Sequence, residues 1–472
     1  MRVTGKLATS GRQIVVVFLL ALALRALFVI LVPYTPWSDA VVYDDRGWRL
    51  AQGLGYTSGN GELTTFPTPM YPFALAWTYV LFGHSIFAAR ILNVVLDSLS
   101  TILILLTAVE LSDDAGKSNS SVPFVSGVLY AVNPVTIYMA GVMMTEILFI
   151  FFFMFMVFLV VRVGIHFQQS RTQVGRSKHL WLHALLGILG GLAALTKAHV
   201  VPTWLYLICI STGRRQFGTK MRGLIIALLF FFLTIAPWLV RSWLFTGRAV
   251  FVDPNYTSWA YCAASTYQGP FYQPLDVGVR TSTVWEQIAS CRQLLLHHVI
   301  TSPVQYLWDT VRRTGHMFDL NIETFILSFS ELIYGRGYSR ASIYMRSNPL
   351  VGLIAILPML QSIVWIGGGI AGLYSRFALT GRKFILTIVG LWVFFYAIIT
   401  GFPRYFIPML SLLTIPLAHL VICFKERRLS CVDANPPARY AHIRSDVTIT
   451  LVLILVVVTW ITTGMKLISR VQ

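Results

Sequence analysis

The sequence predicts an all-α integral membrane protein that crosses the bilayer about eleven times and carries two large loops on one side. Of its 472 residues, 56% are hydrophobic and only 12% are charged, whereas a soluble chain carries about 25% charged residues. This composition excludes an ordinary cytoplasmic enzyme, and it excludes a disordered chain, which needs low hydrophobicity and high charge. The formal net charge is +18. Because the basic residues lie between apolar runs, they indicate membrane topology rather than nucleic-acid binding.

The apolar runs themselves predict the membrane spans, because a helix needs about 20 mostly apolar residues to cross the hydrocarbon core. The first run follows Arg2, Lys6 and Arg12 but lacks a small-residue cleavage site, so we interpret it as a retained helix rather than a signal peptide. In chain order, the predicted spans are residues 14–32, 86–109, 122–141, 144–161, 180–196, 198–212, 223–243, 349–374, 384–400, 405–424 and 447–465.

Lysine and arginine in the short loops predict the orientation, because they concentrate on the cytoplasmic side. With the N-terminus in the cytoplasm, the basic loops all fall on that side; they are 110–121, 162–179, 213–222, 375–383 and 425–446. The two large loops, about 33–85 and 244–348, fall outside and contain no lysine. We therefore expect a multi-pass protein of the inner cell membrane whose site faces the extracytoplasmic side. Its expected parts are an N-terminal module (1–243), a loop region (244–348) and C-terminal helices (349–472).

The larger outer loop is expected to contain helices that lie on the membrane surface. Its second half, 283–317, has apolar residues at helical spacing beside polar ones, which is typical of interfacial amphipathic helices. Cys262 and Cys291 are the two cysteines that we place outside. A disulfide can persist there, and two buried free thiols are the alternative.

Charged residues of both signs gather at the outer ends of the predicted helices, on five separate segments. They are Asp39, Glu146, Lys197, Arg241 and Arg404. Ionisable residues at membrane depth are functional candidates by default. The alternatives are structural, because cations at helix ends can snorkel to water and acidic residues favour a helix N-terminus as caps or through the helix dipole.

Short motifs in the same outer segments add a family resemblance. The first loop and the following helix contain residues 38–43 (SDAVVY), 50–56 (LAQGLGY), 69–73 (PMYPF), 81–83 (LFG) and 89–93 (ARILN). Further along, the chain contains 145–149 (TEILF), 190–197 (GGLAALTK), 236–241 (APWLVR) and 404–408 (RYFIP). In this order the motifs resemble the C-type glycosyltransferases that use polyprenyl-phosphate sugars. The similar branch is bacterial and related to protein O-mannosyltransferases and lipid A aminoarabinose transferases.

The resemblance implies a sugar transfer from a polyprenyl-phosphate carrier to an acceptor hydroxyl by one inverting displacement. Such a transfer needs a base for the hydroxyl and positive charge for the departing phosphate. Asp39 is the expected base, and Glu146 is expected to orient the acceptor or a metal. The expected phosphate ligands are Arg241, Arg404 and Lys197. The candidates for substrate binding are Tyr43, Tyr56, Tyr71 and Tyr405, although membrane proteins also place such rings in an interfacial belt.

What the sequence lacks narrows the donor class and defines the rival hypotheses. It contains neither a glycine-rich nucleotide loop nor a Cys/His cluster with zinc spacing. A lipid-linked donor is therefore expected, with a lipid, glycan or protein acceptor, contact with the lipid bilayer and no nucleic-acid partner. The sequence names no cofactor and leaves a divalent cation open. The rival function is a transporter or flippase of lipid-linked sugars, although the internal repeats typical of transporters are not visible; a scaffold subunit without activity is a third alternative.

Overall fold

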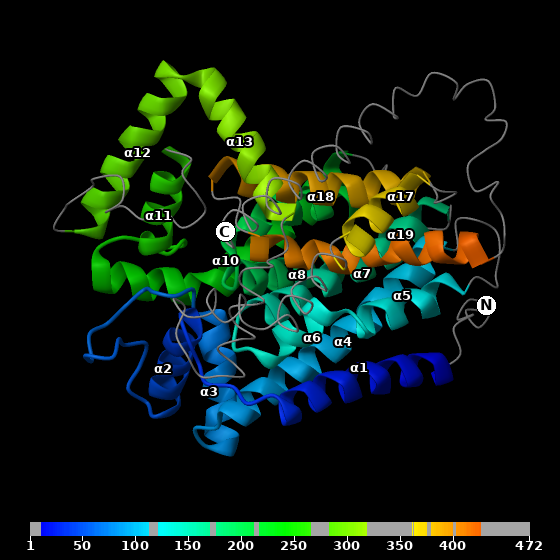
Figure 1. Ribbon diagram of the computed structural model, residues 1–472. Helices are drawn as coiled ribbons and strands as arrows, with labels where there is room; N and C mark the ends of the chain where they lie inside the picture. The colour runs from blue at the N-terminus through cyan, green and yellow to red at the C-terminus, as the bar shows by residue number, and fades with distance from the viewer. Residues whose placement is uncertain are drawn as a thin grey trace, which may run out of the picture.

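The computed structural model describes residues 11–112, 121–169, 176–211, 217–265, 283–318, 361, 363–374, 379–399 and 403–425. Within these residues the regular structure is helical, apart from one isolated β-bridge between Thr57 and Leu63. Figure 1 shows the long helices packed side by side in a bundle, with several shorter helices gathered at one end. The predicted all-α architecture is therefore confirmed for the described part of the chain.

Six helices among the described residues are long and apolar enough to cross a membrane. They are α1 (Gly11–Leu31), α4 (Ile86–Ser112), α7 (Glu146–Gln169), α10 (Phe217–Thr246), α18 (Leu379–Ile399) and α19 (Ile407–Lys425). A seventh span is formed if α5 (Val122–Ala131) and α6 (Pro134–Gly141) are taken together, although the pair is bent by 50°. The protein is thus an integral membrane protein with six to seven candidate spans.

The expected number of eleven spans is not confirmed. Three of the predicted spans contain shorter helices: α8 (Arg176–Ala194), η2 with α9 (Ala198–Val200 and Val201–Ser211), and η5 with α17 (Ile363–Gly367 and Gly368–Tyr374). The apolar part of α8, Leu180–Ala194, is only about 22 Å long at 1.5 Å per residue. Helix breaks inside apolar runs are not visible to a count of hydrophobic residues. The predicted span 447–465 lies outside the described residues.

The sequence accounts for the packing of α1 and for the bend between α5 and α6. The buried residues of α1 are Val17, Ala21, Arg25 and Val29, spaced four apart, so one face of this helix packs against the bundle. The bend between α5 and α6 occurs at Asn133-Pro134. The Asn133 side chain accepts hydrogen bonds from Val135 N and Thr136 N at 3.0 and 3.2 Å, which caps the new helix after the break.

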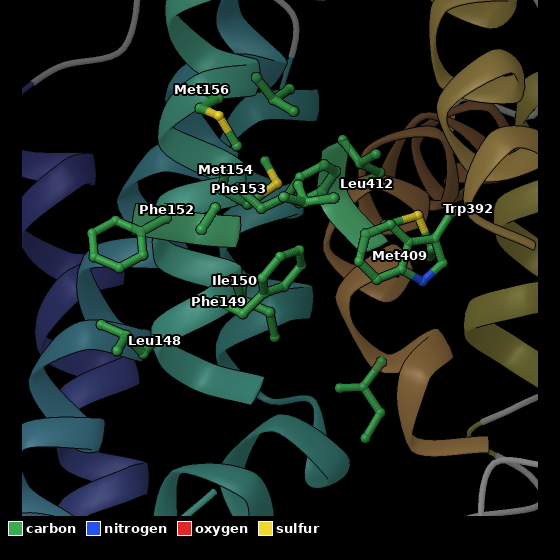
Figure 2. Close-up of a cluster of buried hydrophobic side chains, with 14 of the residues drawn as sticks. Leu148, Phe149, Ile150, Phe152, Phe153, Met154, Met156, Trp392, Met409 and Leu412 are labelled. Atoms are coloured by element: carbon green, nitrogen blue, oxygen red, sulfur yellow. The ribbon is translucent and has the colours of Figure 1, made fainter. Parts of the chain in front are cut away.

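Helix α7 lies at the centre of the core, as Figure 2 shows. The aromatic and methionine-rich run 139–158 is largely buried inside the protein. The ring of Phe149 lies 5.2 Å from that of Trp392 on α18. Trp392 Nε1 in turn donates a hydrogen bond of 2.6 Å to the carbonyl oxygen of Tyr405. The core therefore fixes the backbone that carries Arg404 and Tyr405.

Five helices lie together at one end of the bundle and form the region of the site (Figure 1). They are α2 (Asp39–Ala51), α3 (Met70–Phe82), α11 (Pro254–Ser265), α12 (Val284–Thr301) and α13 (Pro303–Phe318). Helices α12 and α13 project from the bundle as a hairpin, so the helices predicted in 283–317 are present. Cys262 and Cys291 form a disulfide that joins α11 to α12, which decides between the two alternatives left open by the sequence.

Candidate active site

Asp39 is the first residue of α2 and lies where the chain leaves the first membrane helix. Ser38 before it has a φ of 50°, a left-handed value that residues other than glycine rarely adopt. Strained backbone of this kind is concentrated at functional sites. Asp39 Oδ2 accepts a hydrogen bond of 2.7 Å from Arg404 Nη2, across 365 positions of sequence. The Arg404 guanidinium lowers the pKa of Asp39 below its ordinary value, so this carboxyl is ionised at neutral pH.

A second ion pair adjoins the first. Lys197 Nζ lies 3.0 Å from Glu146 Oε1, and both side chains are almost fully buried. Arg404 Nε lies 3.9 Å from the same Glu146 oxygen, so the two pairs form one network. We call Asp39, Glu146, Lys197 and Arg404 the charged quartet. It contains two carboxylates and two cations, supplied by four segments that are distant in sequence.

Helix ends explain how the charged quartet assembles. Glu146 opens α7, where an acidic residue is favoured by the helix dipole. Lys197 follows the end of α8, and its backbone N–H donates a hydrogen bond of 2.7 Å to Ala193 O. Arg404 belongs to the short helix η6 (Pro403–Phe406) that precedes α19. The four predicted residues meet because each lies at the same end of the helix bundle.

A cavity of about 630 Å³ opens beside the charged quartet, a size typical of small-molecule sites. Asp39, Lys197 and Arg404 line it, whereas Glu146 lies behind Lys197 and does not. Aromatic rings make up much of the remaining wall. The Tyr396 ring is stacked between those of His199 and Tyr405, at centroid distances of 4.5 and 4.6 Å.

Helices α11 and α12, with the residue before α11, supply a second group of side chains to the cavity wall. Its side chains there are those of Asp253, Asn255, Tyr256, Trp259 and Gln287. None of these residues is among the site candidates that the sequence predicts. Asp253 precedes Pro254, which is a visible helix-start signal, but nothing in the sequence places that helix start beside Asp39.

The four predicted substrate-binding tyrosines divide into two pairs. Tyr43 and Tyr405 line the cavity. Tyr56 and Tyr71 are buried elsewhere: the Tyr56 hydroxyl donates to Pro67 O at 2.7 Å, and the Tyr71 hydroxyl accepts from Asn93 Nδ2 at 3.0 Å. The structure therefore brings two of the four to the cavity and gives the other two packing roles.

Arg241 is also separate from the cavity. Its guanidinium donates to the carbonyl oxygens of Tyr56 and Thr64, at 2.6 and 2.9 Å, and lies against the rings of Tyr56 and Trp238. These contacts tie the first outer loop to the end of α10. A role in binding phosphate remains an untested expectation for Arg241, whereas bracing this loop is what its contacts do in the structure.

A further ion pair that the sequence analysis missed lies deep in the bundle. Arg25 Nε lies 2.5 Å from Asp97 Oδ2, and both side chains are fully buried. The Tyr130 hydroxyl donates to Asp97 Oδ1 at 2.8 Å, and Arg25 also donates to Ala131 O at 2.9 Å. The sequence signal for this pair is that Arg25 and Asp97 each lie inside an apolar run predicted to span the membrane. Because its groups are satisfied, this pair joins α1, α4 and α5.

The described residues offer no assembled metal site. Among them, no group of three or more His, Cys, Asp or Glu side chains is arranged to hold a metal ion. The divalent cation that the sequence leaves open therefore stays an untested expectation, and the chemistry below is derived from the side chains alone.

Comparison with known proteins finds a similarity to one protein family. The family model described as dolichyl-phosphate-mannose-protein mannosyltransferase matches residues 44–251. Neither the curated proteins nor the solved structures contain a match to the chain. The matched region contains the first outer loop from residue 44 onward, Glu146 and Lys197, whereas Asp39, Asp253 and Arg404 lie outside it. Residues 44–251 are therefore similar to the dolichyl-phosphate-mannose-protein mannosyltransferase family, whose description names a mannose donor linked to dolichyl phosphate.

Proposed function

We propose that the protein transfers a sugar from a polyprenyl monophosphate carrier to an acceptor hydroxyl on the extracytoplasmic face, by one inverting displacement with Asp39 as base. One observation carries the proposal: Asp39 and Arg404 lie 2.7 Å apart on the wall of one cavity. A base and an anion-binding cation are the two groups that the reaction requires. Their side-chain exposures are 34% and 24%, so both remain accessible to a substrate.

In the proposed reaction, Asp39 accepts the proton of the acceptor hydroxyl while that oxygen forms a bond to the anomeric carbon. The bond from the anomeric carbon to the phosphate oxygen breaks, and its electron pair leaves with the polyprenyl phosphate. Arg404 holds the pKa of Asp39 low, so the carboxylate is available at neutral pH but is a modest base. Positioning of the acceptor hydroxyl against the anomeric carbon must therefore supply a large part of the rate.

Arg404 and Lys197 are the proposed ligands of the donor phosphate. Arginine has five N–H donors in a planar fork and can hold a carboxylate and a phosphate oxygen together. Lys197, which is paired with Glu146, adds a point charge. Arg241 is not needed in this scheme, because its guanidinium is held by two carbonyl oxygens of the first loop.

Two observations support an extracytoplasmic site. The Cys262–Cys291 disulfide joins the helices that form the polar cavity wall, and disulfides persist in oxidising compartments. The two large loops also lack lysine, which agrees with the orientation rule. The description of the family names mannose and protein; we propose mannose as the first sugar to test and a protein hydroxyl as the first acceptor, with lipid and glycan acceptors as alternatives.

The test compares Asp39→Asn with wild type in liposomes that contain a polyprenyl-phosphate mannose donor. A matched control is Asp45→Asn on the same helix, because Asp45 pairs with Arg46 and Arg49 and does not line the cavity. We expect transfer by Asp39→Asn to fall at least about 100-fold, as loss of a general base does, and transfer by Asp45→Asn to stay near wild type.

Three outcomes would contradict the proposal. Transfer by Asp39→Asn within threefold of wild type would remove Asp39 from the role of base. A product with the same anomeric configuration as the donor, measured by NMR, would exclude a single displacement. Movement of the lipid-linked sugar across the bilayer without any glycosidic product would support the transporter function instead.

A further inference from the structure

The two halves of the cavity differ in charge, although both are lined by polar groups. One half carries the two cations Lys197 and Arg404 beside Asp39. The other half, formed by α11 and α12, carries the Asp253 carboxyl without a cation partner among the described residues. An anionic phosphate is attracted to the first half, whereas the second half offers it no cation. The half formed by α11 and α12 is therefore suited to an uncharged ligand.

Asp253 can donate as well as accept hydrogen bonds. Its side chain caps α11, with Oδ1 accepting from Asn255 N at 2.8 Å, and the residue is 5% exposed. Burial raises the pKa of Asp253 to about 7. At neutral pH a substantial fraction of this carboxyl therefore carries a proton.

Tyr396 provides a second, independent indication that the cavity binds a ligand. Its ring lines the cavity and is held between His199 and Tyr405, so the side chain cannot turn easily. Its hydroxyl is buried and has no hydrogen-bond partner among the described residues. A buried hydroxyl without a partner is costly to leave in that state, so a bound group that pairs with it is expected.

The rest of this half of the cavity matches the two kinds of surface on a sugar. Gln287 offers an amide with both donors and an acceptor, and Tyr256 and Trp259 offer apolar ring surface. Sugars present hydroxyls around a ring whose faces are largely C–H. The Cys262–Cys291 bridge fixes α11 relative to α12, with a Cα–Cα distance of 4.7 Å. The groups on the two helices are therefore held in a constant arrangement.

We infer that Asp253, Gln287 and Tyr396 form a subsite that hydrogen-bonds the hydroxyls of a sugar ring, in the same cavity as the cations that hold phosphate. The ring expected there is that of the lipid-linked donor; a sugar already present on a glycan acceptor has the same chemistry. This inference rests on the proposed transfer reaction and adds the groups that recognise the transferred sugar. None of the three side chains is assigned a proton-transfer step.

Three variants and one control test the subsite. Tyr396→Phe removes the unpartnered hydroxyl and keeps the ring stack. Asp253→Ser keeps a residue that caps helices well but removes the carboxyl, and Gln287→Met keeps length without hydrogen bonds. The control, Tyr206→Phe, removes a tyrosine hydroxyl on α9 outside the cavity. Thermal unfolding of each purified variant identifies any that fails to fold.

The assay measures KM and kcat for a short-chain polyprenyl-phosphate mannose and for donors that lack one sugar hydroxyl each. We expect KM for the full donor to rise about tenfold in each variant, with a smaller change in kcat and no change in the control. For at least one deoxy donor, wild type and Tyr396→Phe should have equal KM, because the deleted donor hydroxyl is the partner of Tyr396. Quenching of tryptophan fluorescence on donor binding gives the same comparison without turnover.

The outcomes separate this inference from the proposed function. A raised KM for a glycan acceptor, with the donor KM unchanged, would keep the subsite and assign it to the acceptor sugar. Donor and acceptor KM values within twofold of wild type in all folded variants would overturn the subsite, provided that wild type transfers sugar and Asp39→Asn does not. Failure of wild type to transfer any sugar would instead overturn the proposed function.

Discussion

Replacing Lys197 with methionine should destabilise the protein strongly, because it strands a buried carboxylate. The Glu146 side chain is 1% exposed and that of Lys197 is 8% exposed, so water screens their 3.0 Å contact very little. Removing one partner of a buried ion pair costs about 3–5 kcal/mol. Arg404 Nε, at 3.9 Å from Glu146, offsets part of this cost but is already paired with Asp39. We therefore expect a loss of about 3 kcal/mol.

The assay is a double-mutant cycle with Lys197→Met, Glu146→Gln and the combined variant. Unfolding in mixed micelles with increasing SDS, followed by circular dichroism, gives the free energy of unfolding of each variant. The combined variant should recover most of the lost stability, because no unpaired charge remains. If Lys197 also binds the donor phosphate, transfer should stay low in the combined variant although its stability returns. A Lys197→Met variant within about 0.5 kcal/mol of wild type would refute the reasoning about the pair.

Three further predictions concern stability. Burial raises the pKa of Asp253 from 3.8 to about 7, so ionisation of this carboxyl destabilises the fold as pH rises through this range. The free energy of unfolding of Asp253→Asn should exceed that of wild type by up to about 4 kcal/mol at pH 8 and by little near pH 4. Equal differences in the melting temperature at both pH values would contradict this prediction. Reducing the disulfide, which closes 29 residues of sequence, should cost about 3–4 kcal/mol, measured by unfolding with and without reductant. Gly372→Ala brings a Cβ into collision with the backbone oxygen of Pro416 and should cost about 1–3 kcal/mol, whereas Gly390→Ala, with no neighbour within 4 Å, should be neutral in the same assay.

The sequence predicted that the four residues of the charged quartet lie at the same end of the bundle, and their contacts agree with this. Each predicted helix end alternates between the two faces, so Asp39, Glu146, Lys197 and Arg404 could be assigned to one face without knowing how helices pack. The partners within the quartet could not be predicted. Which carboxylate meets which cation depends on the packing of α7, α8 and α19, and this is set by tertiary contacts.

The structure differs from the expectations where the direction of a side chain or a break in a helix decides the outcome. Arg241, Tyr56 and Tyr71 lie in the motifs that resemble the family, but a motif gives the position of a residue and not the direction of its side chain. The expected eleven spans are not confirmed for the described residues, because apolar composition does not reveal where a helix ends. The break at Asn133-Pro134 is nevertheless marked in the sequence by a capping residue and proline. Asp253 was missed because its place beside the cavity depends on how the long outer loop folds back.

The balance of formal charge in the quartet affects the energetics of the proposed turnover. The four side chains sum to zero, and a phosphodiester donor would bring one negative charge. After transfer, the departing phosphomonoester would carry nearly one charge more, while the proton taken up by Asp39 would neutralise a carboxylate. The total would be almost the same before and after the bond exchange. A cycle of this kind needs no counterion to enter or leave the cavity, so ionic strength should influence donor capture far more than the chemical step.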